Sequence, residues 1–351
     1  MRSAIDVGVV GATGVVGQQF IRLLAGHPWF RLTWLGASER SAGRRYADAA
    51  PWRLDGAGPG PAGDLIVEAT RPGRAPRLLF SALDASVAGE IEAAFAAAGH
   101  LVVSNARNYR MHDAVPLVIP EVNPDHLALV DAQAAAFGWP GGIVTNPNCS
   151  TGILSMALAP LRPFGLRRAV VTTLQAVSGA GYPGVPALDI LGNVVPFIGG
   201  EEEKIEREAP KILGALEGGR VVPHGLSISA HTTRVPVADG HTAMVSLEFD
   251  HPPAKADLAA VLAGFSGLPQ QLQLPSAPAR PIVVLDADDR PQPRLDASRG
   301  QGMTVSVGRL RPCPVHHWKL VALGHNAVRG AAGAAILNAE LVAATRARQL
   351  A

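Results

Sequence analysis

The sequence predicts an α/β protein in which a doubly wound, mostly parallel sheet is followed by a second sheet of mixed or antiparallel strands. Short apolar strands alternate with helices in the first half, and a glycine-rich turn joins the first strand to the first helix. The second half has longer strands with fewer helices between them. With 351 residues, the chain is long enough to build two sizeable cores.

The first half supplies the parallel sheet. A β-branched apolar run over 4–10 predicts a strand, and the periodic stretch over 15–24 predicts the helix after the glycine turn. Further strands are expected over 31–37, 64–69, 78–82 and 100–104, with an alanine-rich helix over 87–98. Strands separated by helices favour parallel pairing, because a parallel connection must cross over the sheet.

The second half supplies the other sheet. A helix is expected from 149 to about 161, and strands are expected over 169–177, 226–237, 242–249, 303–307 and 319–323. The Pro- and Gln-rich piece over 268–281 is expected to be an ordered connector. An alanine-rich helix from 327 to about 348 is long enough to reach back to the first half of the structure.

Composition narrows the function classes. Charged residues make up 17% of the chain, and a net charge of +2 without a basic stripe argues against a nucleic-acid partner and favours small ligands. The two cysteines lack metal-ligand spacing, so we expect no metal and a reducing, cytoplasmic compartment. The sequence shows neither a signal peptide nor an uninterrupted apolar run long enough to span a membrane.

The glycine turn is a candidate nucleotide site. Gly11, Gly14 and Gly17 follow a strand and open a helix, where glycines allow close backbone approach and the helix start offers free N–H groups to a pyrophosphate. The spacing is a variant, Gly-x-x-Gly instead of Gly-x-Gly, and Thr13 places a hydroxyl within it. The alternative is a tight turn that binds no ligand.

The end of the second strand bears on cofactor choice. Glu39 could accept a hydrogen bond from a ribose hydroxyl of NAD, whereas Ser38, Arg40 and Ser41 together would suit the 2′-phosphate of NADP. We favour the phosphate. The alternative is a solvated surface loop.

Cys149 is the candidate nucleophile. Asn148 and Pro147 make a turn that places Cys149 in the first turn of a helix, where the helix dipole and free N–H groups favour a thiolate and can hold an oxyanion. The alternative is a small buried hydrophobic residue. Cys313, between two prolines in an irregular segment, is interpreted as a bystander.

A cysteine nucleophile needs a proton-transfer partner. His241 begins a strand, and Arg234 precedes it across a short turn, so both could face one cleft. A structural histidine is the alternative. His316 and His317 would point to opposite faces of an extended chain, which makes them an improbable metal pair.

With these residues in view, the chain resembles the aspartate-semialdehyde dehydrogenase family, particularly its archaeal and fungal branch. The likeness runs nearly end to end, with mild departures before Arg234 and around Cys313. The matching stretches are Gly11–Gly17, Ala37–Gly43, Ser104–Ala106, Tyr109–Met111, Pro120–Asn123, Asn146–Thr151, Gln175–Gly181, Glu201–Lys204, Arg234–Val237, Asp239–His241, His325–Asn326 and Arg329–Gly333.

The resemblance implies an organisation into two domains. Residues 1–148 would form a Rossmann-type NADP-binding domain, completed by the C-terminal helix over 327–351. Residues 149–326 would form an α+β catalytic and dimerisation domain, and the protein would be a homodimer or homotetramer. Gly330 and Gly333 would let the last helix pack close to the cofactor domain.

The resemblance also implies site roles. Cys149 would be the nucleophile, His241 the acid/base, and Gln175 would orient the reacting carbonyl. Arg234 would grip the substrate carboxylate, a task that suits a planar guanidinium. Phosphate would be held by Arg110 and Lys204, and the substrate amino group by Glu201. We choose Glu201 over Glu202 and Glu203 because Glu-x-x-Lys places it on the helix face of Lys204.

The cofactor set joins the turn residues with positions that the resemblance implies. The expected NADP-binding residues are Gly11, Thr13, Gly14, Val15, Val16, Ser38, Arg40, Ser41, Ser81, Ser178, Gly179 and Asn326.

The implied activity is the reversible, NADPH-dependent reduction of L-aspartyl-4-phosphate to L-aspartate 4-semialdehyde and phosphate through a cysteine thioester. This step belongs to lysine, threonine and methionine biosynthesis. The alternatives are a malonyl-CoA reductase, an N-acetyl-glutamyl-phosphate reductase and, from another class, a non-catalytic NADP-binding sensor. A sensor would have no need of Cys149, Gln175, Arg234 and His241 in register.

Overall fold

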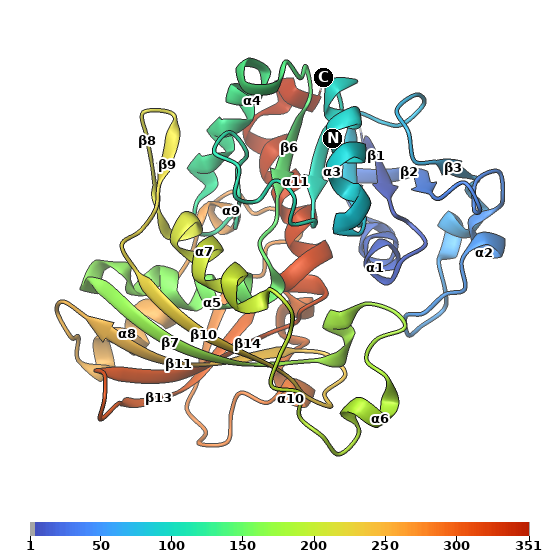
Figure 1. The fold of residues 1–351 in the computed structure, drawn as a ribbon. Helices are drawn as coiled ribbons and strands as arrows, with labels where there is room; N and C mark the ends of the chain where they lie inside the picture. The colour runs from blue at the N-terminus through green and yellow to red at the C-terminus, as the bar shows by residue number, and fades with distance from the viewer. Residues whose placement is uncertain (1–3, 351) are drawn as a thin grey trace.

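The computed structural model describes residues 4–350, and within them the first half of the chain forms a six-stranded sheet that is parallel throughout (Figure 1). Its strand order is β3-β2-β1-β4-β5-β6, the doubly wound order of dinucleotide-binding folds, so the predicted fold class is confirmed. The strands are β1 (Ile5–Val10), β2 (Phe30–Ala37), β3 (Val67–Ala69), β4 (Leu78–Ser81), β5 (Leu101–Ser104) and β6 (Gly142–Thr145). Residues 1–3 and 351 of the predicted cofactor domain lie outside the described residues.

The helices of this half are α1 (Val15–Leu24), α2 (Tyr46–Ala49), α3 (Ala85–Ala97) and α4 (Leu129–Phe137). The expected bounds of α1 are confirmed, whereas the strand expected over 64–69 is only Val67–Ala69, because a 3₁₀ turn covers Gly60–Asp64. The sequence analysis did not predict β6 and α4.

The second half forms a mixed six-stranded sheet in the order β10-β7-β11-β14-β13-β12, as predicted. Strands β10 and β7 are parallel, as are β12 and β13, and the other neighbours are antiparallel. The strands are β7 (Leu166–Gln175), β10 (Ser227–Arg234), β11 (His241–Phe249), β12 (Ile282–Leu285), β13 (Val305–Pro312) and β14 (Trp318–Gly324). Strand β12 was not predicted, and β13 extends to Pro312, beyond the expected end at 307.

One face of the second sheet is covered by α5 (Cys149–Leu158), α7 (Glu201–Leu213) and α8 (Lys255–Ala263). Helix α5 ends earlier than expected, because Pro160 and Pro163 fall in a 3₁₀ segment over Ala159–Phe164. Helices α5 and α7 lie side by side on this face (Figure 1). The opposite face exposes Val170 and Met244, which line a cavity of about 570 Å³.

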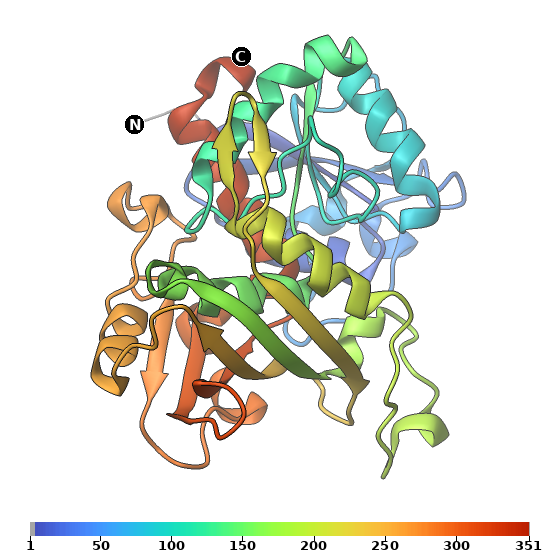
Figure 2. The same ribbon diagram turned by 60° about the vertical axis from the view of Figure 1, so that its left-hand side comes forward.

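Smaller elements lie at the periphery. The hairpin of β8 (Ala215–Glu217) and β9 (Arg220–Val222) follows α7, and α6 (Ala187–Ile190) projects from the body on a long loop (Figure 2). The connector expected over 268–281 is ordered and begins with α9 (Leu268–Gln271), while α10 (Pro293–Asp296) precedes β13. No helix among residues 4–350 has the length and apolar character needed to cross a bilayer.

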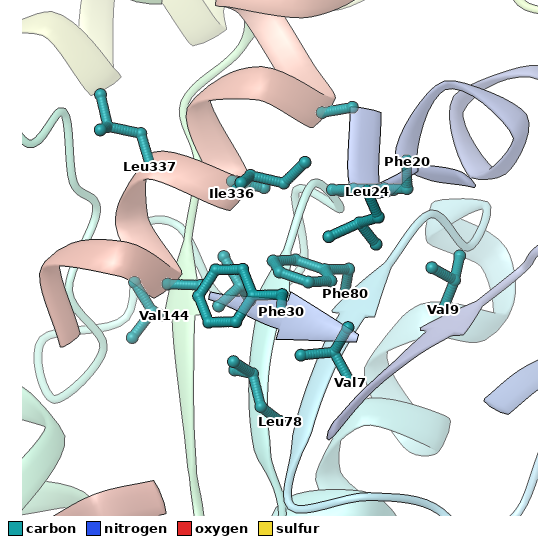
Figure 3. Packing of buried hydrophobic residues seen from close by; sticks show 14 of the residues in the cluster. Val7, Val9, Phe20, Leu24, Phe30, Leu78, Phe80, Val144, Ile336 and Leu337 are labelled. Carbon is teal, nitrogen blue, oxygen red and sulfur yellow. The ribbon is translucent and has the colours of Figure 1, made fainter. Parts of the chain in front are cut away.

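The first core lies between the parallel sheet and the C-terminal helix α11 (Gly333–Thr345). Phe20, Phe80, Ile336 and Leu337 pack there, and the rings of Phe20 and Phe80 stack with centroids 5.0 Å apart (Figure 3). Burying such a side chain contributes about 1.5–3 kcal/mol. The helix expected from 327 is not continuous, because a π turn over Val328–Ala332 precedes α11.

Candidate active site

The second sheet brings three of the predicted residues to one edge. Gln175 is the last residue of β7, and Arg234, the last residue of β10, lies directly opposite it in the parallel pair. Strand β11 runs antiparallel to β7, so its first residue, His241, lies at the same edge. All three side chains are buried, so the close packing of the interior around them fixes their positions.

Cys149 begins α5, as predicted. The Oδ1 atom of Asn148 accepts hydrogen bonds from the backbone N–H groups of Ser150 at 3.0 Å and Thr151 at 3.2 Å, which makes Asn148 the N-cap. The cap fixes the start of the helix one residue before the thiol. The cap therefore fixes the position of Cys149 through the backbone.

The protonation state of Cys149 differs from the expectation. Burial, together with the negative charge of Glu201, raises the pKa of the thiol to about 12, although Arg110, the N–H of Ser150 and Arg234 act in the opposite direction. The helix start alone predicted a thiolate. Burial and the Glu201 carboxylate outweigh the N–H of Ser150 and the two arginines, so the pKa of Cys149 is raised and not lowered.

His241 is held in one tautomer. The backbone N–H of Ala176 donates to Nδ1 of His241 at 3.0 Å, so the proton of the neutral ring lies on Nε2. Burial and the nearby positive charge of Arg234 lower the pKa of His241 to about 3. His241 therefore presents a neutral Nε2–H donor.

Arg234 and His241 both bond to the backbone of Ala176 and both lie against Gly179. Nη1 of Arg234 donates to the carbonyl oxygen of Ala176 at 2.7 Å. A Cβ atom on Gly179 would lie 2.8 Å from Nη1 of Arg234 and 2.9 Å from Nε2 of His241. Gly179 thus lets its loop approach both side chains, which any larger residue would prevent.

Glu201 is the acidic residue that faces the cysteine. Its Oε2 atom accepts from Nδ2 of Asn148 at 2.8 Å, and Oε1 pairs with Nζ of Lys204 at 2.6 Å. Glu202 accepts instead from the backbone N–H of Thr232, and Glu203 pairs with Arg207 at the surface. The helix-face argument from the sequence thus picks the residue that lies beside Asn148.

Arg110 is connected to the α5 N-cap through Glu208, which accepts from Arg110 and from the N–H of Asn148. It is buried, with Nη1 bonded to Glu208 at 2.9 Å and Nη2 bonded to the carbonyl oxygen of Asn105 at 2.7 Å. Sequence reasoning missed Asn148 as a site residue, and also Glu208 and Lys211 of α7. The helical spacing that singled out Glu201 and Lys204 would have found Glu208 two turns further on.

The glycine turn has the geometry that a pyrophosphate needs. Gly11 has a φ of +76°, and a Cβ atom on Gly17 would lie 2.3 Å from the carbonyl oxygen of Gly11, so α1 approaches the turn as closely as its backbone allows. No side chain caps α1 at Gly14, which leaves its N-terminus open to an anion. Thr13 belongs to the same turn, and Val15 and Val16 open α1.

The other expected cofactor residues fall into two groups. Ser38, Arg40 and Ser41 follow β2 in a turn closed by the Ser41 N–H to Ser38 carbonyl bond of 2.8 Å, and Ser81 is buried at the end of β4. Ser81 ends β4, which with β1 flanks the switch in strand order, and Ser38, Arg40 and Ser41 follow β2 on the other side of β1. All lie at the carboxyl ends of strands, where ligands bind in such sheets.

Ser178 and Asn326 form the second group, beside His241. Oδ1 of Asn326 accepts from the N–H of Gly240, and Nδ2 donates to Oγ of Ser178, each at 2.8 Å. Asn326 therefore joins the loop before His241 to the loop that carries Gly179.

The expectation for Gly330 and Gly333 is wrong in detail. Gly330 lies in the π turn, and a Cβ atom there would be 2.5 Å from Cβ of Cys149. Gly333 instead packs against Met303 and Val328. Gly330 thus allows close approach to Cys149, and not to the parallel sheet.

Together, the parallel sheet with its glycine turn and the second sheet, which gathers His241 and Arg234 at one edge, are typical of a dinucleotide-dependent dehydrogenase. Residues 6–130 match the semialdehyde dehydrogenase NAD binding domain, and residues 158–329 match the semialdehyde dehydrogenase dimerisation domain.

Full-length relatives narrow the class. The aspartate-semialdehyde dehydrogenase of Archaeoglobus fulgidus is 50% identical over 338 residues, covering 96% of this chain and 97% of the relative. That of Cryptococcus neoformans is 50% identical over 355 residues, covering 97% of each. The crystal structure of the Candida albicans enzyme with NADP superposes with a TM-score of 0.89 at 46% identity, covering 97% of this chain and 98% of that one. The chain belongs to the aspartate-semialdehyde dehydrogenase family.

Proposed function

We propose that this enzyme reduces L-aspartyl-4-phosphate to L-aspartate 4-semialdehyde with NADPH, and that it runs the reverse reaction with phosphate as co-substrate. The proposal rests on the position of Cys149 at the start of α5. It lies near one edge of the second sheet, where Gln175, Arg234 and His241 are brought together. The family membership and the relative solved with NADP support the same reading.

Substrate binding uses the charges around Cys149. Arg234 takes the α-carboxylate, Glu201 takes the α-ammonium, and Arg110 with Lys204 takes the phosphate. Arg110 and Lys204 line one cavity of about 190 Å³, which is room for a small anion between them. Gln175, whose Nε2 lies 3.4 Å from Oε2 of Glu201, orients the reacting carbonyl.

Binding of the substrate would also change the pKa of Cys149. The negative charge of Glu201 raises the pKa of Cys149, and an ammonium paired with Glu201 would cancel much of that charge. The substrate thereby favours the thiolate that attacks it.

The chemistry proceeds on sulfur. The sulfur of Cys149 attacks the acyl carbon as the C–O bond to phosphate breaks, and the thiol proton leaves with the phosphate. A thioester forms while Arg110 and Lys204 neutralise the leaving phosphate. Bound NADPH supplies the hydride that reduces the thioester. As the resulting thiohemiacetal loses its C–S bond, Nε2–H of His241 donates a hydrogen bond to the departing sulfur, and the semialdehyde is released.

The glycine turn and the uncapped start of α1 fit the pyrophosphate of NADP, and Ser38, Arg40 and Ser41 fit its 2′-phosphate. Ser178, Gly179 and Asn326 would bring the nicotinamide end beside His241. We retain 1–148 with 327–351 as the cofactor domain, and 149–326 as the catalytic and dimerisation domain.

The Glu201 carboxylate argues against the two alternative reductases. Malonyl-CoA has no amino group, and N-acetyl-glutamyl phosphate has an acetylated one that carries no charge, so neither would use the Glu201 carboxylate.

We also propose a cytoplasmic homodimer or homotetramer, assembled through the face of the second sheet that exposes Val170 and Met244.

The direct test is an absorbance assay of NADP reduction with aspartate semialdehyde and phosphate, run beside NADPH oxidation with malonyl-CoA. We expect turnover only in the first assay, with strict dependence on phosphate. Turnover in the second assay alone would reject aspartyl phosphate as the substrate.

A further inference from the structure

Helix α7 carries a charged face that the proposed reaction only partly uses. Glu201, Lys204, Glu208 and Lys211 are spaced at i, i+3, i+7 and i+10, which places them on one side of the helix. The first two belong to the proposed substrate site. Glu208 and Lys211 are both buried and have no role in the reaction described so far.

Glu208 uses both carboxylate oxygens at the active site. Its Oε1 atom accepts from Nη1 of Arg110 at 2.9 Å, and its Oε2 atom accepts from the backbone N–H of Asn148 at 2.6 Å. The side chain is 3% exposed, so neither bond is weakened by solvent. One carboxylate therefore joins the proposed phosphate ligand to the residue that caps the helix of Cys149.

Lys211 holds the backbone of the same arginine. Its Nζ donates to the carbonyl oxygens of Arg110 at 2.7 Å, His112 at 2.9 Å and Val115 at 3.1 Å, which uses all three ammonium hydrogens. Helix α7 thus grips Arg110 at two points, its guanidinium through Glu208 and its carbonyl group through Lys211.

The remaining donors of Arg110 are left for a ligand. Nη2 donates to the carbonyl oxygen of Asn105, and the buried Nε atom has no hydrogen-bond partner among the described residues. Arg110 also lines the cavity that Lys204 shares. A fixed guanidinium with a free Nε–H beside a small cavity is suited to an oxyanion of set position.

We propose that Glu208 is a positioning residue that holds Arg110 at a fixed place relative to Cys149, and that this bridge sets the affinity for phosphate. The inference rests on the proposed function, because it takes Arg110 as a phosphate ligand. A carboxylate is required at this position, since two donors point at it and an amide would turn its NH₂ group toward one of them.

The test compares Glu208→Gln with Glu206→Gln. Glu206 lies on the same helix, accepts only the N–H of Ala230 and does not contact Arg110, so it is a matched control. For Glu208→Gln we expect the phosphate KM to rise by about tenfold to a hundredfold, the usual effect of losing a buried hydrogen bond to a charged group. The semialdehyde KM should change by less than about threefold, and the control should resemble the wild type in both constants.

A double-mutant cycle with Arg110→Ala separates positioning from general loss of stability. If Glu208 acts through Arg110, Glu208→Gln should add less than about threefold to the phosphate KM of Arg110→Ala. Full additivity, or an equal rise in both KM values, would overturn the proposal.

Two further measurements keep the outcomes distinct. If Glu208→Gln does not fold, Glu208→Asp keeps the charge but is too short to reach both partners, and it should raise the phosphate KM by a smaller factor. A normal phosphate KM in Glu208→Asp would also overturn the proposal. A wild-type enzyme whose turnover needs no phosphate would instead reject the proposed function.

Discussion

The nucleotide-binding turn is built from one continuous stretch of backbone, whereas the catalytic edge of the second sheet gathers side chains from α5, α7, β7, β10 and β11. The turn works by the absence of side chains at Gly11 and Gly17. The catalytic edge works by burying charged and titratable groups against one another, which moves the pKa of Cys149 up and that of His241 down. Steric changes should therefore damage the first region, and changes of charge the second.

The largest expected effect is at the catalytic edge, in Cys149→Ala. Without the sulfur no thioester can form, and the loss of turnover should reach about 10⁴-fold or more. The measurement is NADP reduction with semialdehyde and phosphate. Because the nucleotide turn is a separate region, NADP binding followed by fluorescence should stay near the wild-type level. Residual full activity would reject the thioester mechanism.

His241→Asn should lose about 10²–10³-fold in turnover, the usual range for losing a hydrogen-bond donor to developing charge. The asparagine can still accept a hydrogen bond from the N–H of Ala176, so the fold should be kept, but it places no donor at the position of Nε2.

The pH dependence of the turnover rate tests the protonation state of His241. Since the pKa of His241 is lowered to about 3, its protonation should contribute no transition to the rate profile between pH 5 and 8. A transition there that disappears in His241→Asn would contradict the neutral donor.

At the nucleotide turn, Gly17→Ala should weaken NADP binding through shape alone. Its Cβ atom would meet the carbonyl oxygen of Gly11 at 2.3 Å, so α1 must move away from the turn, at a cost of about 1–3 kcal/mol. Gly225→Ala is the matched control, because no atom lies within 4 Å of its added Cβ. The comparison is made by titrating NADP into both variants. Equal dissociation constants would show that the turn is not a close-packed cofactor site.

The contrast between the two regions also explains what the sequence could predict. The bounds of α1 and the glycine turn follow from local spacing, and the structure has them as expected. Helical spacing also singled out Glu201 among three glutamates. Strands β6 and β12 were missed although β4 and β5, which were predicted, are equally short. Both missed strands directly follow a residue typical of turns, Gly141 before β6 and Pro281 before β12.

The features that the sequence could not predict depend on tertiary contacts. Nothing local to Glu208 or Lys211 shows that their partners are Arg110 and the segment after it, about a hundred positions away in the chain. The raised pKa of Cys149 was missed for the same reason, since it depends on burial and on Glu201, which the helix start cannot reveal. Periodicity thus predicts which face a residue shares, but not which distant charge it meets.

The relative reactivity of the two thiols tests the charges at the catalytic edge. Contacts with the N–H groups of His316 and Val315 and with Ser246 outweigh burial and lower the pKa of Cys313, whereas that of Cys149 is raised to about 12. Iodoacetamide reacts with thiolates, so at neutral pH it should modify Cys313 before Cys149 in the free enzyme. Peptide mapping by mass spectrometry after a short exposure distinguishes the two. Faster modification of Cys149 would show that the helix dipole outweighs burial.

The same alkylation assay, in a Cys313→Ser background, measures how the charge of Glu201 affects the reactivity of Cys149. A carboxylate near a thiol disfavours the thiolate, so Glu201→Gln should lower the pKa of Cys149 and raise its alkylation rate by a few-fold at any pH below about 12. Glu203→Gln removes a charge from the same helix turn, but at the surface, where Glu203 pairs with Arg207, so it should leave the rate unchanged. If both variants react alike, the shift at Cys149 reflects the overall charge of α7 and not the contact between Glu201 and the N-cap.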